Sequence, residues 1–402
     1  MTKSFYSLAY GQSFANLGDV FYIVALISTV YNVTNSMFFV ALVPFCNTMA
    51  GFLSSFLAPL FIDRYRLKHL LVYSQLSKTI LLLVLSIYST LHGYNHLFPV
   101  LFVLIFLIAS LDGIANPASS ALLPQLVTEE DLVKANSILS SLYQGIQLGG
   151  WAIGGVVAGV LHANGLLWFT LILYGISTIV MRGIRSLQES EFTSTRTAQS
   201  MWEGWSVILH QKQMRTFHLL IFFNSIANTV WVSAILYPFL QERLHVGTQW
   251  WSYLNVSMLI GLTLAGFIGM KYSEFIETKH TLLLIGTTGI IVLTTLSFGL
   301  NQLPIIAVII IGLNGVAQEL QSLCIHTTIQ RLVKEKLLAK VYAAQGSLVM
   351  LTFGLSTVLM GLIGDHIHIV AVYLLAGVSV GSSLVVLLLS QRSANKIIDL
   401  EL

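Results

Sequence analysis

Long apolar stretches dominate this 402-residue sequence and limit what it can fold into. A helix that spans the bilayer core needs about 20 apolar residues. The chain contains twelve such stretches, joined mostly by short connections, near residues 5–31, 37–61, 70–91, 97–122, 136–161, 165–182, 216–240, 249–270, 281–299, 303–325, 341–363 and 369–390. The runs are continuous, whereas strands of a membrane β-barrel alternate apolar and polar residues. The sequence therefore predicts an all-α, polytopic membrane protein with twelve transmembrane helices.

The composition agrees with a chain that lies in lipid and argues against an enzyme. Charged residues make up only 9% of the sequence and apolar residues 55%, with a mean hydropathy of +0.81, whereas roughly a quarter of a soluble domain is charged. The sequence contains no ATP-binding P-loop, no H-E-x-x-H zinc motif and no G-x-S-x-G nucleophile turn. We therefore expect no enzyme, no cofactor and no metal site, since the His366-x-His368 pair is by itself a weak metal signal.

Basic residues are distributed unevenly between the predicted loops. If the N-terminus is cytoplasmic, 18 of the 20 Lys and Arg residues fall on that side, while Arg243 lies outside and Lys78 lies in span 70–91. We expect the long stem of Lys78 to snorkel toward the inner interface. This bias predicts a bacterial cytoplasmic membrane protein with both termini inside. The basic loops favour anionic inner-leaflet lipid, so the net charge of +3 calls for no nucleic-acid partner.

An internal repeat divides the chain into two halves. The segment QLVTEEDLVK at 125–134 recurs 206 residues later as RLVKEKLLAK at 331–340, with five identical positions. The repeat maps the loop after the fourth predicted span onto the loop after the tenth. We predict two pseudo-symmetric six-helix bundles at 1–182 and 215–391. A cytoplasmic linker at 183–214 with an interfacial helix would join them, and a cytoplasmic tail at 392–402 would follow.

Three segments carry a resemblance to a known family. They are GQSFANLGD at 11–19, DRYRLK at 63–68, and the stretch from Pro117 that contains ALLPQLV and LVKANS. With them the chain resembles the major facilitator superfamily. It is most similar to the twelve-span drug:proton antiporters, in the macrolide-efflux-like and siderophore-exporter-like branch. The resemblance implies two halves that rock about a central site.

The sequence departs from that family's pattern at several positions. Pro59 stands where the family's loop after span two opens with Gly, and Arg66 replaces the Gly that follows Asp-Arg-x. Span 97–122 has no Arg, so a proton relay that depends on one is not implied. Span five resembles the antiporter motif G-x-x-x-G-P-x-x-G-G, with Gly150 in place of Pro. Small residues in such a row also allow close helix packing, and they are Gly145, Gly149, Gly154, Gly155 and Gly159.

Three acidic residues lie inside predicted spans, namely Asp19, Asp112 and Glu319. Ionisable side chains are costly in a bilayer and mark pathways or proton relays, so we assign all three to proton coupling. The position 206 residues after Asp112 is Gln318, next to Glu319, so both halves place an acid at similar depth. The alternative is a packing or pairing role, for Asp19 in a polar seam, for Asp112 with Arg64 or Lys134, and for Glu319 with Arg331 or His326.

Polar and aromatic side chains form stripes at helical spacing in spans one, five and seven. We predict that these stripes and Gln318 line a cavity that offers amide hydrogen bonds and flat aromatic faces to an amphipathic substrate. Ordinary interhelical contacts are the alternative. The stripes consist of Gln12 and Asn16, then Gln144, Gln147 and Trp151, then Asn224, Asn228 and Trp231.

A charged loop follows the second span. Asp63, Arg64, Arg66 and Lys68 stand where the resembled family closes its cytoplasmic side. We predict that they form a cytoplasmic gate by pairing with helix ends. A solvated basic loop that only sets orientation is the alternative.

These features predict a secondary active transporter that exports amphipathic, drug-like compounds by proton antiport and alternating access. We expect a monomer whose partners are the substrate, protons and membrane lipid. One alternative is an exporter of a dedicated metabolite, siderophore or lipid. An alternative of another class is a non-transporting membrane binding or scaffold protein, which would tolerate neutralisation of the embedded acids.

Overall fold

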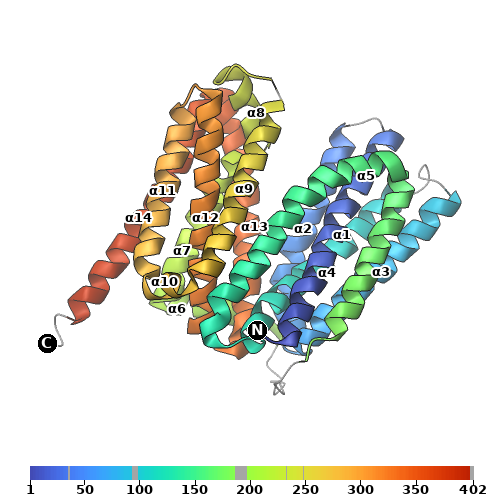
Figure 1. Cartoon of the computed structure of the whole chain (residues 1–402), viewed down its shortest axis with the longest axis horizontal. Coiled ribbons are helices and arrows are strands. Elements are labelled where there is room, and N and C mark those ends of the chain that lie inside the picture. Colours follow the sequence, from blue (N-terminus) through green and yellow to red (C-terminus); the bar gives the residue numbers. More distant parts are fainter. Residues whose placement is uncertain (35–36, 93–97, 186–196, 232, 248, 399–402) are drawn as a thin grey trace. The chain divides into compact units, whose positions relative to one another are not determined.

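The computed structural model is helical, as the apolar runs predict (Figure 1). It describes residues 1–34, 37–92, 98–185, 197–231, 233–247 and 249–398, and no strand occurs within these ranges. In lipid, a helix satisfies all its backbone hydrogen bonds within its own segment. The all-α prediction is therefore confirmed.

The first half of the chain forms six α-helices and two short 3-10 helices. In chain order they are α1 (Lys3–Thr34), α2 (Met37–Ile62), α3 (Leu67–His92), α4 (Phe98–Leu122), η1 (Leu123–Gln125), η2 (Glu129–Asp131), α5 (Leu132–Arg182) and α6 (Thr197–His210). The predicted spans 136–161 and 165–182 both fall within α5, whose 51 residues suffice for two crossings.

The second half contains a span that is not one regular helix. Its elements are α7 (Lys212–Ala227), η3 (Asn228–Trp231), α8 (Ser233–Glu242), α9 (Gln249–Lys271), α10 (Ser273–Thr278), α11 (His280–Leu300), α12 (Pro304–Leu332), α13 (Glu335–His366) and α14 (Ile369–Ile398). The predicted span 216–240 is divided between α7, η3 and α8. The backbone tightens into a 3-10 turn at η3, and Pro238 lies inside α8.

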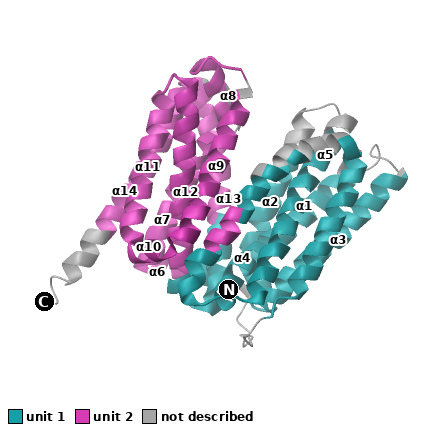
Figure 2. Cartoon of the chain, viewed as in Figure 1, with its two compact units in different colours: residues 1–135, 142–205, 330–347 teal, residues 136–141, 206–329, 348–402 magenta. Residues whose placement is uncertain are grey.

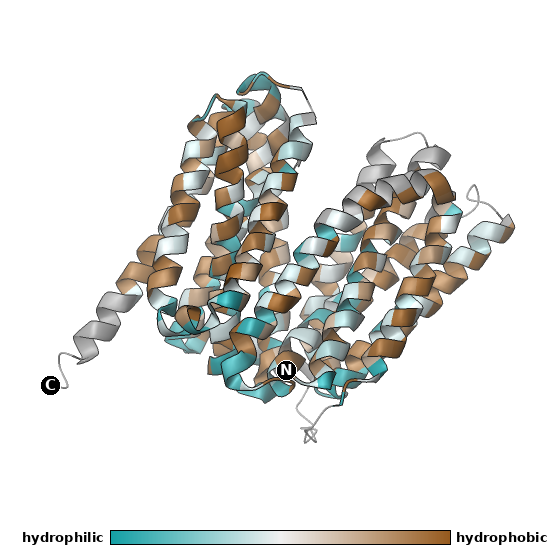
Figure 3. Cartoon of the chain, in the orientation of Figure 1, coloured by the Kyte–Doolittle hydropathy of each residue, from teal (hydrophilic) through white to brown (hydrophobic). Residues whose placement is uncertain are grey.

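Nine helices of the described residues are long and apolar enough to cross a membrane. Apolar residues run along the helices of each unit, and polar residues gather at helix ends (Figure 3). The three other predicted spans correspond to α1, the first part of α5, and the interrupted segment from α7 to α8. A multi-pass membrane protein is thus supported, and the total of twelve spans stays a prediction.

The chain separates into two compact units (Figure 2). Unit 1 comprises residues 1–135, 142–205 and 330–347, and unit 2 comprises residues 136–141, 206–329 and 348–402. This partition follows packing, so the start of α13 belongs to unit 1 and a short piece of α5 belongs to unit 2. The predicted boundaries at 182 and 215 and the pseudo-symmetry of the halves stay predictions.

Unit 1 contains a close crossing of α2 and α4 at Gly113. A Cβ atom on Gly113 would lie 1.9 Å from the Ser54 hydroxyl oxygen and 2.8 Å from the Gly51 carbonyl oxygen. The Ser55 hydroxyl donates to the Gly113 carbonyl oxygen at 3.2 Å. In span five, a Cβ placed on Gly150 would lie 3.3 Å from Val20 Cγ1 of α1, which is a close helix contact. The predicted close packing is not found at Gly145 or Gly149, where a Cβ would meet no described atom within 4 Å outside the neighbouring backbone of its own helix.

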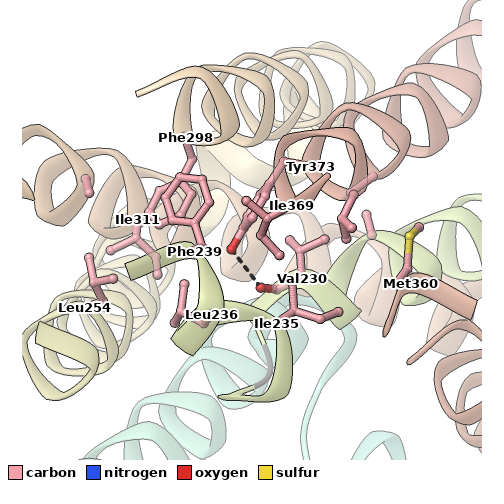
Figure 4. Close-up of a cluster of buried hydrophobic side chains, with 14 of the residues drawn as sticks. Val230, Ile235, Leu236, Phe239, Leu254, Phe298, Ile311, Met360, Ile369 and Tyr373 are labelled. Carbon is pink, nitrogen blue, oxygen red and sulfur yellow. Dashed lines mark hydrogen bonds between the residues drawn. The ribbon is translucent and has the colours of Figure 1, made fainter. Parts of the chain in front are cut away.

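Unit 2 has an aromatic core beside the interrupted span (Figure 4). Phe239 stacks on Phe298 with 5.0 Å between ring centroids, and Tyr373 lies 4.6 Å from Phe239 and 5.3 Å from Phe298. The Tyr373 hydroxyl donates to the Val230 carbonyl oxygen at 3.1 Å. This bond supplies a donor to a backbone carbonyl at η3, where the regular helix ladder is interrupted.

The first prediction tests the crossing at Gly113. Gly113→Ala should lower the midpoint of thermal unfolding of the purified protein, because an added methyl group in a packed contact costs about 1–3 kcal/mol. Gly145→Ala is the matched control, since its Cβ has space and alanine favours a helix. Equal midpoints for the two variants would contradict this packing.

Candidate functional site

A buried lysine lies between two carboxylates in unit 1. The Lys78 ammonium nitrogen is 2.7 Å from Asp19 Oδ1 and 2.7 Å from Asp112 Oδ1. The Lys78 side chain is only 1% exposed, whereas those of Asp19 and Asp112 are 29% and 33% exposed. The two acids are thus the accessible members of this group, which we call the Lys78 cluster.

The three charged residues come from the middle of three different helices, α1, α3 and α4. The backbone N–H and C=O groups at this depth are hydrogen-bonded within their own helices. Only other side chains are therefore left to balance the charges. A charge left alone in an apolar interior costs several kcal/mol. The mutual pairing of Lys78, Asp19 and Asp112 therefore accounts for their presence inside apolar helices.

Tyrosines surround the Lys78 cluster. The Tyr174 hydroxyl from α5 donates a short hydrogen bond to Asp19 Oδ1, and the Lys78 ammonium lies 4.8 Å from the centre of the Tyr174 ring. Gly18 allows this approach, since a Cβ there would lie 2.6 Å from Tyr174 Cε1. Tyr22, one turn after Asp19 on α1, is 4% exposed, and its hydroxyl has no hydrogen-bond partner among the described residues.

The charge balance of the cluster determines what it can do chemically. Two carboxylates and one ammonium sum to one negative charge when all are ionised. One added proton makes the group neutral, a favourable state in a low-dielectric surrounding. The cluster therefore has the composition of a site that takes up one proton.

A second lysine in unit 1 is also shared by two carboxylates. Lys340, near the start of α13, is 3% exposed, and its ammonium nitrogen is 2.5 Å from Asp63 Oδ1 and 2.6 Å from Glu203 Oε2. Gly204 allows α6 to approach the backbone of α13 closely, because a Cβ on this residue would lie 2.2 Å from the Lys340 carbonyl oxygen. We call this group the Lys340 cluster; it connects the turn after α2, the linker helix α6 and α13.

Unit 2 carries a chain of amides and hydroxyls. Asn224 donates to Gln321 Oε1 at 2.6 Å, and Gln321 donates to the Thr288 hydroxyl oxygen at 2.6 Å. Gln318 donates to Asn314 Oδ1 at 2.6 Å. Glu319 accepts a short hydrogen bond from the Ser140 hydroxyl.

Comparison with known proteins decides the family. The model of the Major Facilitator Superfamily matches residues 8–274 of the chain. This protein belongs to the major facilitator superfamily. Similar proteins of Bacillus subtilis (strain 168) are the uncharacterized MFS-type transporters YfmI, 29% identical over 94% of both chains, and YjbB, 23% identical over 90% of this chain and 89% of YjbB.

Solved structures share the fold of this transporter at low identity. A bacterial homologue of the iron transporter ferroportin in an outward-facing state has a TM-score of 0.76 and 15% identity, with 97% of this chain and 99% of that chain covered. The human organic anion transporter MFSD10 (TETRAN) has a TM-score of 0.77 and 11% identity, with 96% and 99% covered. The family match and the MFS-type transporter relatives, and not these distant structures, show that the chain is a transporter and not an enzyme.

The structure brings together some of the residues that the sequence singled out in this transporter. Asp19 and Asp112 meet at Lys78, which the sequence analysis had assigned to the membrane interface. That interpretation was wrong, because the Lys78 side chain is 1% exposed and its ammonium nitrogen pairs with both acids in the middle of α3. The presence of two embedded acids and one embedded lysine in the same half of the sequence was the signal for this pairing.

The predicted gate residues divide into two groups. Asp63 enters the Lys340 cluster, whereas Arg64, Arg66 and Lys68 form no ion pair with another described residue. Sequence reasoning missed Glu203. The sequence offered only a weak signal for its role, namely an acidic residue next to Gly204 in the predicted linker helix.

The stripe residues lie in both units. Gln12 donates to the Ser119 hydroxyl oxygen at 2.7 Å, and Asn16, Gln144 and Gln147 also belong to unit 1. Asn224, Asn228, Trp231 and Gln318 belong to unit 2, where Trp231 packs edge-on against Phe298 at 4.9 Å. The side chain of Trp151 lies outside the described residues. The common substrate cavity stays a prediction.

The second prediction tests the balance of charge at Lys78. Lys78→Met leaves two carboxylates close together, and removal of one partner from a buried ion pair costs about 3–5 kcal/mol. Protonation of the acids would relieve this repulsion, so the thermal midpoint of the variant should rise toward the wild-type value as the pH falls. Lys3→Met, at an exposed position of α1, is the control. A Lys78→Met midpoint that equals wild type at all pH values would contradict the pairing.

Proposed function

We propose that this transporter exports amphipathic compounds in exchange for protons and that the Lys78 cluster is the proton-coupling site. The observation that carries the proposal is the buried Lys78 ammonium, shared by Asp19 of α1 and Asp112 of α4. Buried ionisable groups inside a membrane mark proton relays and substrate pathways. Because one lysine is shared by two acids on different helices, protonation of one acid weakens the ion pair between its helix and the helix of the lysine.

The coupling step follows from electrostatics. With both acids ionised, Lys78 attracts Asp19 and Asp112 equally and holds α1 and α4 to α3. A proton on one carboxyl removes its charge, so the ammonium remains paired mainly with the other acid. The attachment of one helix to α3 then weakens. A state of the protein in which that helix has moved becomes more populated on protonation.

The Lys340 cluster is proposed as the cytoplasmic gate. Under the predicted orientation it lies at the inner end of unit 1, since Asp63 follows the second span and Glu203 belongs to the linker. Its ion pairs hold α13 to the turn after α2 and to α6. They would have to break for that end to open, which sets a barrier that substrate or proton binding can lower.

The fold neighbours support secondary transport and leave the substrate open. They include the E. coli fucose:proton symporter FucP, with a TM-score of 0.68 and 14% identity over 95% of this chain and 99% of that chain. The neighbours named above are an iron transporter homologue and an organic anion transporter. One fold thus serves different substrates. Export of amphipathic compounds rests on the resemblance of the N-terminal motifs and on the polar and aromatic stripes.

The third prediction tests proton coupling. Asp19→Asn and Asp112→Asn keep size and hydrogen bonding and remove the proton site, so each should abolish uphill transport while the protein still inserts. The measurement is uptake of a panel of labelled amphipathic compounds into everted vesicles, with and without a protonophore. Glu130→Gln, at an exposed position of η2, is the matched control. Gradient-driven uptake at the wild-type rate in both Asn variants would place coupling elsewhere, with Glu319 the next candidate.

The fourth prediction tests the gate. Asp63→Asn should slow transport several-fold with normal expression, because it removes one of the two charges that hold Lys340. Arg64→Gln is the neighbouring control, since the Arg64 side chain is exposed and forms no ion pair among the described residues. Equal transport rates in both variants and wild type would leave this loop as an orientation signal.

The same assays separate the alternatives. An exporter of a dedicated metabolite, siderophore or lipid would show proton-dependent uptake of one compound class and none of the amphipathic panel. A non-transporting binding or scaffold protein would show no uptake at all and would tolerate Asp19→Asn. A uniporter would move substrate without response to the protonophore.

A further inference from the structure

We propose that unit 2 selects substrates that carry a hydrogen-bond donor, because its two hydrogen-bonded amide chains end in oxygen acceptors at Asn224 and Gln318. The preferred substrate group is a hydroxyl or an N–H group, whereas an ionised carboxylate offers these ends no donor. The proposal deepens the proposed function and rests on it in one respect, that an amphipathic substrate reaches the polar side chains of α7 and α12.

The first chain runs from α7 through α12 to the backbone of α11. The Thr288 hydroxyl donates its one hydrogen to the Leu284 carbonyl oxygen at 2.6 Å, so the Thr288 oxygen can only accept from its other neighbour. Gln321 donates to it from Nε2 at 2.6 Å, which turns Gln321 Oε1 toward Asn224. Asn224 donates from Nδ2 to that oxygen at 2.6 Å. Asn224 Oδ1 is left at the end of the chain, and it has no hydrogen-bond partner among the described residues.

The second chain has the same direction and the same kind of anchor on α11. The Thr294 hydroxyl donates to the Ile290 carbonyl oxygen at 2.7 Å, and Asn314 donates from Nδ2 to the Thr294 hydroxyl oxygen at 2.7 Å. Gln318 donates from Nε2 to Asn314 Oδ1 at 2.6 Å, so Gln318 Oε1 is the end of this chain. Reversal of either chain would break the bond between its hydroxyl and the helix backbone, so both chains keep this direction.

The two chain ends are more accessible than the inner members. Asn224 and Gln318 are partly exposed, whereas Thr288, Asn314 and Gln321 are buried. Polar groups inside a membrane-spanning segment are costly against lipid, so we expect these ends to face water or a ligand. A ligand donor would extend a chain by one bond, whereas a ligand acceptor would place oxygen against oxygen. The Asn224 oxygen is also enclosed without a donor, a state that costs free energy until a donor pairs with it.

Neighbouring polar side chains do not oppose this preference. Glu319, next to Gln318 on α12, accepts from the Ser140 hydroxyl, and in its ionised form it adds acceptors and no donor. Asn228, one turn after Asn224, belongs to neither chain, so its amide can turn either end toward a ligand. The direction of the two chains therefore sets the donor preference of this part of unit 2.

Equilibrium binding to the purified transporter in lipid nanodiscs tests the proposal without a proton gradient. The probes are pairs of amphipathic compounds, each an alcohol and its methyl ether, which keeps the oxygen and loses the donor. In at least one pair the alcohol should bind about tenfold more tightly, because the ether leaves an acceptor of the protein unpaired. Gln318→Met and Asn224→Leu should each reduce this preference by weakening the binding of the alcohol alone. Gln213→Met, at an exposed position of α7, is the matched control.

Two variants of an anchor separate the direction of the chain from direct contact with the ligand. Thr288 is fully buried and is joined to the chain end only through Gln321. Thr288→Val removes the hydroxyl and frees the amides to turn over, so the preference for the alcohol should fall several-fold. Thr288→Ser keeps the hydroxyl and should keep the preference. Unchanged affinity for the ether in both variants shows that they are folded.

The outcomes separate this proposal from the proposed function. Equal binding of alcohol and ether in every pair, tighter binding of the ethers, or no binding of any pair would overturn it. A preference that survives Gln318→Met and Asn224→Leu would also overturn it, because it would then follow from the size of the added methyl group. A preference that depends on both ends, in a protein without proton-driven uptake into vesicles, would instead count against the proposed function alone.

Discussion

An ammonium group buried among apolar helices must be matched by nearby anions, and much of unit 1 is arranged around this requirement. Lys78 is almost completely shielded, and it is held by one acid from α1 and one from α4 at equal distances. Because these helices approach through side chains and not through backbone bonds, the ion pairs connect α1 and α4 to α3 at this depth. A change in the charge of either acid therefore acts on three helices at once.

The same arrangement occurs twice in unit 1. Lys340 is shared by Asp63 and Glu203 as Lys78 is shared by Asp19 and Asp112. In both clusters the carboxylates outnumber the ammonium groups, so each cluster has one acid that can be released without leaving the lysine unpaired. Such an arrangement is suited to a contact that must form and break repeatedly. A one-to-one buried pair would instead leave an isolated charge whenever it opened.

Unit 2 is built from different interactions. Its interior polar groups are mainly amides and hydroxyls, connected from Asn224 through Gln321 to Thr288. Its apolar core is aromatic and packs beside η3, where Tyr373 donates to a carbonyl at the break in the helix. Neutral hydrogen bonds and aromatic contacts respond little to pH, so Glu319 is the acid of this unit through which a proton could act on its polar interior. The substrate is decided by side chains and not by the shared fold.

The amino-acid sequence by itself determined the helical class, the membrane environment and the two acids that are central in their helices. These properties follow from local rules, since apolar length and the cost of a buried charge can be judged one segment at a time. The tertiary structure alone decided which groups pair. Lys78 lies 59 residues from Asp19, and Lys340 lies 137 residues from Glu203, so no local pattern links them. Lys134 and Lys340 occupy matching positions of the sequence repeat, yet Lys134 is exposed and Lys340 is buried between two acids. Whether a charged side chain meets water or a partner depends on the helices packed against it, and only the folded chain specifies them.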